Sequence, residues 1–319
     1  MTNIKPAKTI FTLMKVLIIG QVWPEPTSSA AGSRMMQLIE LFQNANWKVH
    51  FASASVKGEA AADFKILGIE EHTIALNDSG FDAFAKALQP DIVMFDRFMV
   101  EEQFGWRIAE NCPNSLRILD TEDLHGLRKG REAAHKQNVP FTKEFLVNDY
   151  AKREIASIYR CDLSLIISEV EMHYLKEFFH VPEELLLYIP FMVEKLTGTA
   201  KNRWKTYENR LDFITIGNFR HEPNWQSVRY LKEIIWPKIK KQLPDAQLKI
   251  YGSYPSQKVT QLHNSKEEFL IMGKAENALE VIENSRVLLA PLQTGAGLKG
   301  KLLEAMQCGT PAVATTIGV

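Results

Sequence analysis

The residue types best suited to hold an anion gather in the segment TGAGLKGKLLE, residues 294–304. The segment follows an apolar run of strand length, and its glycines predict a turn before a helix that begins near Leu298. Such a strand–turn–helix unit presents free backbone N–H groups and the positive end of the helix to a phosphate. Lys299 and Lys301 add two positive charges there, so the segment predicts a phosphate site.

Glu304 would let the same segment hold a ribose. On a helix, Lys301 and Glu304 project about 60° apart, and both flank an apolar stripe. A carboxylate in that place can accept hydrogen bonds from both hydroxyls of a ribose while the lysine contacts a diphosphate. The alternative is a solvated helix flank with a Lys–Glu pair. The spacing leaves both interpretations open, because a glycine-rich turn is a weak motif.

A second candidate segment, GQVWPEPTSSAAGSR at residues 20–34, follows the first apolar run of the chain. It lacks the G-x-G-x-x-G spacing of a dinucleotide site, which argues against a nicotinamide-dependent oxidoreductase. Ser28, Ser29 and Ser33 are candidate caps for the helix that follows. A loop of this length, with Gly32 near its end, can face a substrate in a cleft.

Two further groups of polar residues follow predicted strands. Asp123 and His125 lie with several arginines just after the run LRILD, and Asn218 and Arg220 follow the run DFITI. Both groups would lie at the carboxyl edge of a sheet, where α/β proteins bind ligands. The spacing of Asp123 and His125 matches no common metal-ligand pattern. We therefore expect no metal ion there and favour salt bridges for the arginines.

Apolar runs of strand length alternate with helix-period segments along the whole chain. Continuous apolar strands in a βαβα order predict parallel sheets covered by helices on both faces. The polar segment 194–210 interrupts this order once. We predict an α/β fold of two doubly wound, Rossmann-like domains facing a cleft, residues 1–196 with a core from about residue 14, and residues 208–319. The second domain would be incomplete, because the sequence ends on a strand.

The composition argues against several classes of protein. The chain has 319 residues, 45% of them hydrophobic, and its 38 basic residues balance 38 acidic ones. These values argue against intrinsic disorder and a dedicated nucleic-acid-binding protein, and no apolar run has the roughly 20 residues of a transmembrane helix. Three widely spaced cysteines are typical of a reducing cytoplasm. Basic residues outnumber acidic ones after residue 200, which indicates either anion binding or chance scatter.

These segments together resemble the group 1 glycosyltransferases, which have the GT-B fold. The runs ITIGNFRHEPNWQSVRYL and VLLAPLQTGAGLKGKLLEAMQCGTPAVATTIG are similar to their second domain, and MKVLIIGQVWPEPTSSAAGSR and ILDTEDLHGLR to their first. The resemblance covers nearly the whole chain from Met14. Three features differ: Ala296 stands where the family often has a glutamate, the histidine of the DTEDLH run is displaced, and the family continues beyond Val319.

The resemblance implies transfer of a sugar, with retention, from a nucleotide diphosphate sugar on the second domain to an acceptor hydroxyl on the first. Glu304 then corresponds to a ribose-binding glutamate, and Gly32 to a glycine that approaches the diphosphate. No metal or other cofactor is expected, because lysines and a helix end meet the leaving diphosphate. The expected donor-site residues are Gly32, Asn218, Arg220, Gly297, Leu298, Lys299, Lys301 and Glu304, and the expected catalytic residues are Asp123 and His125.

We predict a hexosyltransferase-like enzyme that acts in the synthesis of a cell-surface glycan. Its partners would be a nucleotide-sugar donor and a glycan, lipid-linked or small-molecule acceptor, without nucleic acid. The expected location is the cytoplasm, including a peripheral position on the inner face of the cell membrane. Two alternatives stay open: a non-catalytic GT-B module that binds a nucleotide or a partner, and a nucleotide-sugar epimerase.

Overall fold

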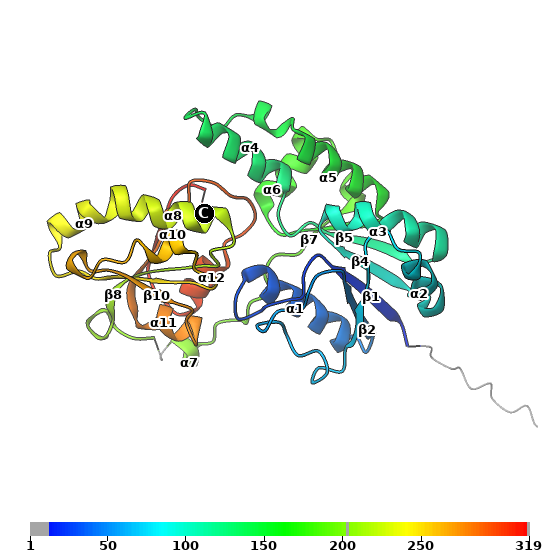
Figure 1. Ribbon diagram of the computed structural model, residues 1–319, viewed down its shortest axis with the longest axis horizontal. Helices are drawn as coiled ribbons and strands as arrows, with labels where there is room; N and C mark the ends of the chain where they lie inside the picture. The colour runs from blue at the N-terminus through cyan, green and yellow to red at the C-terminus, as the bar shows by residue number, and fades with distance from the viewer. Residues whose placement is uncertain (1–12, 202–203, 318–319) are drawn as a thin grey trace, which may run out of the picture.

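The computed structural model describes residues 13–201 and 204–317, which form two α/β domains (Figure 1). Residues 1–12, which precede the core predicted from about residue 14, lie outside the described residues. The N-terminal domain is built on a seven-stranded sheet and the C-terminal domain on a five-stranded sheet. No helix in the described part of the chain is long and apolar enough to cross a membrane.

The strands of the N-terminal sheet pair in the order β3-β2-β1-β4-β5-β6-β7, and every pair is parallel. Their bounds are β1 (Lys15–Gly20), β2 (Lys48–Ser53), β3 (Glu70–Thr73), β4 (Ile92–Asp96), β5 (Leu116–Asp120), β6 (Leu163–Ile166) and β7 (Leu186–Tyr188). The central strands β1 and β4 are buried because both are continuous apolar runs. No apolar pattern predicts β3, whose sequence is EEHT.

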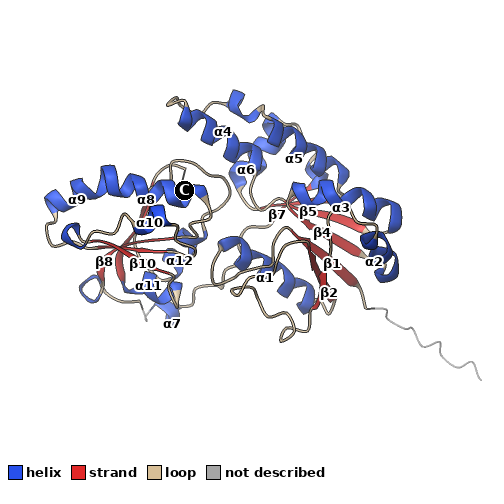
Figure 2. Ribbon diagram, in the orientation of Figure 1, coloured by secondary structure: helices blue, strands red, loops and turns tan. Residues whose placement is uncertain are grey.

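Helices cover both faces of this sheet, as the sequence pattern predicts (Figure 2). Leu17 and Ile19 face a cluster formed with α2 to α5, whereas Val16 and Ile18 face a cluster formed with α1. The helical segments are α1 (Ala30–Asn44), α2 (Gly80–Leu88), α3 (Phe98–Asn111), α4 (His125–Lys136), η1 (Lys143–Leu146), α5 (Asp149–Arg160), α6 (Glu169–His173), η2 (Tyr174–Phe178) and η3 (Glu183–Leu185).

The C-terminal sheet is also parallel and has the order β10-β9-β8-β11-β12. Its strands are β8 (Leu211–Ile216), β9 (Leu248–Tyr251), β10 (Phe269–Gly273), β11 (Ser285–Ala290) and β12 (Ala312–Ala314). The helical segments of this part of the chain are α7 (Gly198–Lys201), η4 (Tyr207–Asn209), α8 (Glu222–Tyr230), η5 (Leu231–Ile235), α9 (Trp236–Gln242), α10 (Gln257–Thr260), η6 (Ser265–Glu267), α11 (Ala278–Asn284) and α12 (Gly300–Gln307).

The long helical run from Glu222 to Gln242 changes its winding along its length. α8 begins at Glu222 with Pro223 in its first turn. The π-helical segment η5 separates α8 from α9, and Pro237 lies in the first turn of α9. Proline has no backbone N–H and crowds the preceding turn, and the wider π-helical turn just before Pro237 accommodates it.

In each sheet the strand order reverses once, between β1 and β4 and between β8 and β11. Loops that leave neighbouring strands toward opposite faces open a crevice at the carboxyl edge, and α/β proteins bind ligands there. In this structure the loops after β1, β4, β8 and β9 face one another across the domain boundary. The fold therefore brings the two crevices together.

Arg210, at the start of the C-terminal domain, joins the ends of two helices. Its guanidinium is buried and donates to the carbonyl oxygens of Glu283 and Cys308, each at 2.9 Å, and to the hydroxyl of Thr310. The last carbonyls of a helix have no partner within the helix and carry the negative end of its dipole. The buried Arg210 cation therefore donates hydrogen bonds to free carbonyl groups at the ends of both α11 and α12, and its charge opposes the negative ends of their dipoles.

The Arg210→Met variant should lose at least about 3 kcal/mol of unfolding free energy, because several buried carbonyls would then have no donor. Urea unfolding measures this loss. The matched control is Arg229→Met, which removes an exposed arginine 3.9 Å from Glu233 and should change stability by less than about 0.5 kcal/mol. Equal losses in the two variants would contradict the role given to Arg210.

Candidate functional site

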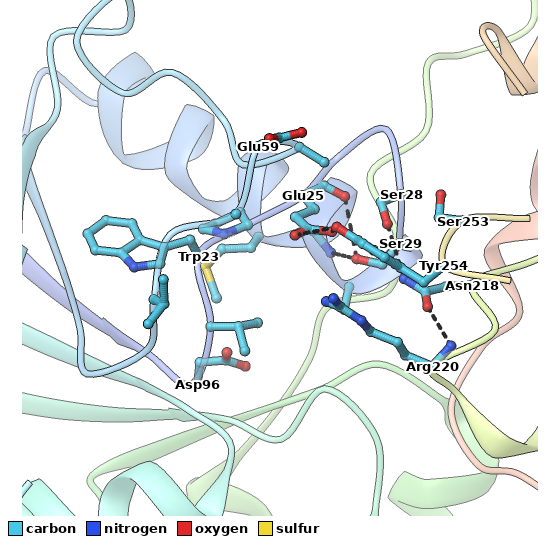
Figure 3. Close-up of a pocket in the computed structure, with 18 of the residues that line it drawn as sticks. Trp23, Glu25, Ser28, Ser29, Glu59, Asp96, Asn218, Arg220, Ser253 and Tyr254 are labelled. Carbon is cyan, nitrogen blue, oxygen red and sulfur yellow. Dashed lines mark hydrogen bonds between the residues drawn. The ribbon is translucent and has the colours of Figure 1, made fainter. Parts of the chain in front are cut away.

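A cavity of about 870 Å³ lies between the two domains (Figure 3). Its N-terminal wall consists of the loop after β1, the first turn of α1 and residues that follow β2 and β4. Its C-terminal wall consists of residues that follow β8, β9 and β10. The lining residues used below are Trp23, Glu25, Ser28, Gly32, Glu59, Asp96, Arg97, Asn218, Arg220, Ser253, Tyr254 and Lys274. A volume of this size suits a small organic ligand.

The N-terminal wall depends on close packing at Gly32. Ser29 caps α1, since its hydroxyl accepts a hydrogen bond from the Gly32 N–H at 3.0 Å. A Cβ atom on Gly32 would lie 2.5 Å from backbone atoms of Glu25. Only glycine therefore allows the start of α1 to pack against the part of the loop that lines the cavity.

Two side-chain contacts join the two walls, and a third lies within the C-terminal wall. The Tyr254 hydroxyl donates to the Glu25 carboxylate, with oxygen–oxygen distances of 2.8 and 2.9 Å. Asn218 Nδ2 donates to Ser28 Oγ at 3.1 Å. The Arg220 guanidinium lies 3.5 Å from the centroid of the Tyr254 ring, a cation–π contact. Because Tyr254 and Glu25 come from different domains, as do Asn218 and Ser28, these two hydrogen-bonded contacts set the width of the cavity.

The two lysines predicted to bind phosphate are connected to the cavity but do not line it. α12 begins at Gly300, two residues later than predicted, with Lys299 as the extended residue before it. Lys301 Nζ donates to Asn224 Oδ1 at 2.9 Å, and Asn224 Nδ2 donates to the carbonyl oxygen of Asn218 at 2.9 Å. This chain of hydrogen bonds leads from Lys301 to the cavity wall.

Both lysines lie in surroundings that oppose their charge. Desolvation lowers the pKa of each to about 8, and the charge of Lys299 further lowers the pKa of Lys301. Lys299 Nζ donates to the carbonyl oxygens of Ala296 and Gly297 at 2.5 and 3.0 Å. Desolvation also raises the pKa of Glu304. The negative charge of Glu304 acts on Lys301 in the opposite direction to desolvation and raises its pKa. Two desolvated cations this close together favour the binding of an anion.

The glycine-rich loop after β11 packs directly on the N-terminal domain. The Gly297 N–H donates to Glu171 Oε1 at 2.8 Å, and Arg131 Nη1 donates to the Gly295 carbonyl oxygen at 2.8 Å. Gly297 has φ +67°, and a Cβ atom on it would lie 2.9 Å from the Asp123 Cβ. An N–H predicted to meet a phosphate thus already has an acceptor from the other domain.

Glu171 is buried at this contact. Desolvation, followed by the charge of Asp123, raises the pKa of its carboxyl group to about 8. Oε1 also accepts the Leu124 N–H at 2.9 Å, whereas Oε2 has no hydrogen-bond partner in the part of the chain that the structure describes. The neutral acid is therefore the favoured form of Glu171 at pH 7.

Asp123 and His125, the predicted catalytic residues, are both buried, and neither lines the cavity. Asp123 Oδ2 accepts from Arg128 at 3.0 Å, which is one of the salt bridges that the sequence predicts. His125 Nδ1 lies 3.1 Å from the Asp123 carbonyl oxygen, and the His125 N–H donates to Glu154 at 2.9 Å. Asp123 thus lies at the domain boundary, whereas His125 begins α4 inside the N-terminal domain.

The structure places the predicted donor residues in two groups. Gly32, Asn218 and Arg220 line the cavity. The second group, which does not line it, lies in or beside the start of α12 and comprises Gly297, Leu298, Lys299, Lys301 and Glu304.

No sequence motif indicated that Glu25, Tyr254 or Lys274 would line this site. Glu25 lies between two prolines, which restrict the loop and were the one local signal available. Tyr254, three residues after the end of β9, adopts φ +56°. Glu25 and Tyr254 meet only when the two domains pack together.

Solved structures contain the same two-domain architecture. HepE (Alr3699) of Anabaena, in complex with UDP and glucose, is 11% identical with a TM-score of 0.63, covering 96% of this chain and 81% of that one. Sucrose-phosphate synthase of Thermosynechococcus elongatus is 14% identical (TM-score 0.62, 96% and 82%). WaaG, a glycosyltransferase involved in lipopolysaccharide biosynthesis, is 11% identical (TM-score 0.59, 96% and 82%). The chain therefore has the GT-B fold of two Rossmann-like domains, which confirms the predicted α/β class.

A sequence comparison with protein families also matches part of the chain. Residues 210–319 match the model described as glycosyl transferases group 1. The C-terminal domain thus matches the group 1 glycosyl transferases, which agrees with the resemblance noted in the sequence. No curated protein sequence matches the chain.

The Gly32→Ala variant should be destabilised by about 1–3 kcal/mol, because the new methyl group would overlap the backbone of Glu25. Thermal unfolding of the full chain measures the change. Gly198→Ala is the matched control, since a Cβ atom there meets no atom within 4 Å. An unchanged melting temperature for Gly32→Ala would contradict the close approach of α1 to the loop.

Proposed function

We propose that this chain transfers a sugar, with retention of the anomeric configuration, from a nucleotide diphosphate sugar to an acceptor hydroxyl. The observation that carries the proposal is the cavity between the carboxyl edges of two GT-B domains, connected to the desolvated cations Lys299 and Lys301. The group 1 match supports it. So do the structures of HepE in complex with UDP and with UDP-glucose.

In this proposal the nucleoside diphosphate lies on the C-terminal domain. Lys299, Lys301 and the positive end of α12 would contact the diphosphate. Glu304 would accept the ribose hydroxyls, and the backbone at Gly297 and Leu298 would close around the phosphates. The start of α1, which packs closely because of Gly32, approaches the same ligand from the other domain.

The proposed reaction depends on stabilising the leaving group. The bond between the sugar C1 and the diphosphate oxygen breaks through an oxocarbenium-like state, so the diphosphate gains negative charge. The acceptor oxygen forms the new bond to C1, and the proton of its hydroxyl passes to the leaving diphosphate. Lysines aimed at that charge bind it more strongly in the transition state than in the ground state, which accelerates the reaction. Because they supply positive charge at the leaving group, we propose that transfer needs no metal ion.

The acceptor would approach along the N-terminal wall. Trp23 offers an apolar surface there, and Glu59, Asp96 and Arg97 offer hydrogen bonds to sugar hydroxyls. We propose a glycan, lipid-linked or small-molecule acceptor, a role in cell-surface glycan synthesis, and a location in the cytoplasm or on the inner face of the membrane. The similarity to WaaG, which is involved in lipopolysaccharide biosynthesis, supports this role.

A second candidate function is a non-catalytic module that binds a nucleotide or a partner. One observation favours it: the Gly297 N–H, which a donor phosphate would use, already donates to Glu171. Turnover separates the two candidates, because such a module would bind a nucleotide without releasing one from a sugar donor.

A nucleotide screen followed by a transfer assay tests the proposed function. A ligand that binds the folded chain raises its melting temperature by mass action, so UDP, GDP, ADP and dTDP identify the base. The matching nucleotide-sugars are then assayed for release of the nucleoside diphosphate, with and without a chelator, and NMR gives the anomeric configuration of the product. Absence of both binding and release would overturn the proposal, and binding without release would favour the module.

The Glu304→Ala variant should bind the preferred nucleoside diphosphate about tenfold to a hundredfold more weakly, because it loses charge-assisted hydrogen bonds to the ribose. Calorimetric titration gives the two affinities. Glu280→Ala, an exposed glutamate on α11, is the matched control and should bind as the unchanged chain does. Full affinity in Glu304→Ala would remove this residue from the site.

Nucleoside diphosphate affinity should fall as the pH rises from 7 to 9.5. Lys299 and Lys301 have pKa values lowered to about 8, so both lose their charge in this range, and the phosphates are already fully ionised. Each lysine contributes up to about a tenfold loss per pH unit above its pKa. The Lys301→Arg variant should show a smaller loss, because a guanidinium keeps its charge. A constant affinity over this range would exclude these lysines from phosphate binding.

A further inference from the structure

Three side chains with metal-binding groups meet near one edge of the N-terminal sheet. His50 lies on β2, Glu70 and His72 lie on β3, and the parallel register pairs His50 with Glu70. Residues two apart on a strand point to the same face, so all three side chains project from one face of the sheet. One ligand atom of each residue lies within 4.8 Å of the others, and none of the three residues lines the cavity.

The distances between these atoms are close to those between ligands of a single metal ion. His50 Nδ1 lies 3.1 Å from His72 Nε2 and 3.2 Å from Glu70 Oε2. Ligands arranged tetrahedrally at about 2.0–2.1 Å from zinc lie about 3.3 Å from one another. Two imidazoles with one carboxylate are also a ligand set that zinc uses in proteins.

We propose that His50, Glu70 and His72 bind one divalent transition-metal ion of the zinc type, with water as the fourth ligand. Half of the Glu70 side chain is exposed, which gives the ion a route from solvent. His50 Nε2 is buried and has no hydrogen-bond partner among the described residues, so Nδ1 is the nitrogen that His50 offers to the ion.

Neighbouring side chains orient the three ligands. Lys48 Nζ pairs with Glu70 Oε1 at 2.6 Å, which leaves Oε2 directed toward His50. The His72 ring packs against Phe84 of α2, with a centroid distance of 4.7 Å. Outer contacts of this kind fix the orientation of metal ligands.

The bound ion would hold an edge strand in place. β3 has four residues, none of them apolar, and lies at the edge of the sheet. It therefore contributes little burial of its own, and a metal that joins β2 to β3 would compensate. Lys15 and Lys48 place positive charge near His50, so we expect micromolar rather than nanomolar affinity.

Metal titration of the full chain tests this site. The chain is first freed of metal with a chelator, then titrated calorimetrically with Zn²⁺, and with Co²⁺ as a probe whose visible spectrum reports tetrahedral coordination. We expect one equivalent of Zn²⁺ to bind and to raise the melting temperature. His72→Ala and Glu70→Gln should each weaken binding at least about tenfold. Both residues are less buried than His50, so the variants should fold.

Two variants serve as matched controls. Glu71→Gln changes the next residue of β3, which points to the opposite face and pairs with Lys57. His135→Ala removes an exposed histidine of α4. Both should bind Zn²⁺ as the unchanged chain does. No stoichiometric binding, or binding that persists in both His72→Ala and Glu70→Gln, would overturn the proposal, and neither result depends on glycosyl transfer.

Discussion

Parallel strands that are covered on both faces leave only their ends free for chemistry. In both sheets of this chain helices cover the central strands, so the polar side chains that line the cavity lie in the loops at the carboxyl edges. The reversal of strand order widens each edge into a crevice, and the packing of the domains merges the two crevices into one cavity. The contacts Tyr254–Glu25 and Asn218–Ser28 then determine how closely the edges approach.

The N-terminal domain and the domain boundary also contain charges that are removed from water. Arg34 pairs with Asp120 at 3.1 Å with both side chains buried, and Arg34 Nε and Nη1 have no partner within the described residues. Glu171, Lys299 and Lys301 add three titratable groups at the boundary. Desolvation raises the pKa of Glu171 and lowers the pKa of each lysine, in every case to about 8. Burying charge costs several kcal/mol per ion, and an interface that served only to hold two domains together would use apolar side chains. Perturbed groups gathered this way are typical of functional sites.

The apolar rhythm of the sequence was sufficient to predict the two parallel sheets, because strands such as β1 and β4 are buried by their own composition. It did not predict β3, because the four residues of this strand are all polar. β3 is a strand because it pairs with β2. Within the site, glycine and lysine spacing located the start of α12 to within two residues. The Glu25–Tyr254 hydrogen bond could not be predicted, since it joins residues more than two hundred positions apart through domain packing. The burial of His125 depends in the same way on its neighbours in α3 and α5.

The hydrogen bond from Gly297 to Glu171 reduces the conformational entropy that the glycine-rich loop would lose on binding a ligand. A loop with φ angles available mainly to glycine has many conformations when it is free, and ordering it on a ligand would lose that entropy. Here a carboxyl oxygen of the other domain holds the N–H in place, so the loop is ordered by folding itself. An anion that reaches this N–H exchanges one acceptor for another. Selectivity at the loop then depends on whether the incoming group is a better acceptor than a neutral carboxylic acid, which a charged phosphate oxygen is and a sugar hydroxyl is not.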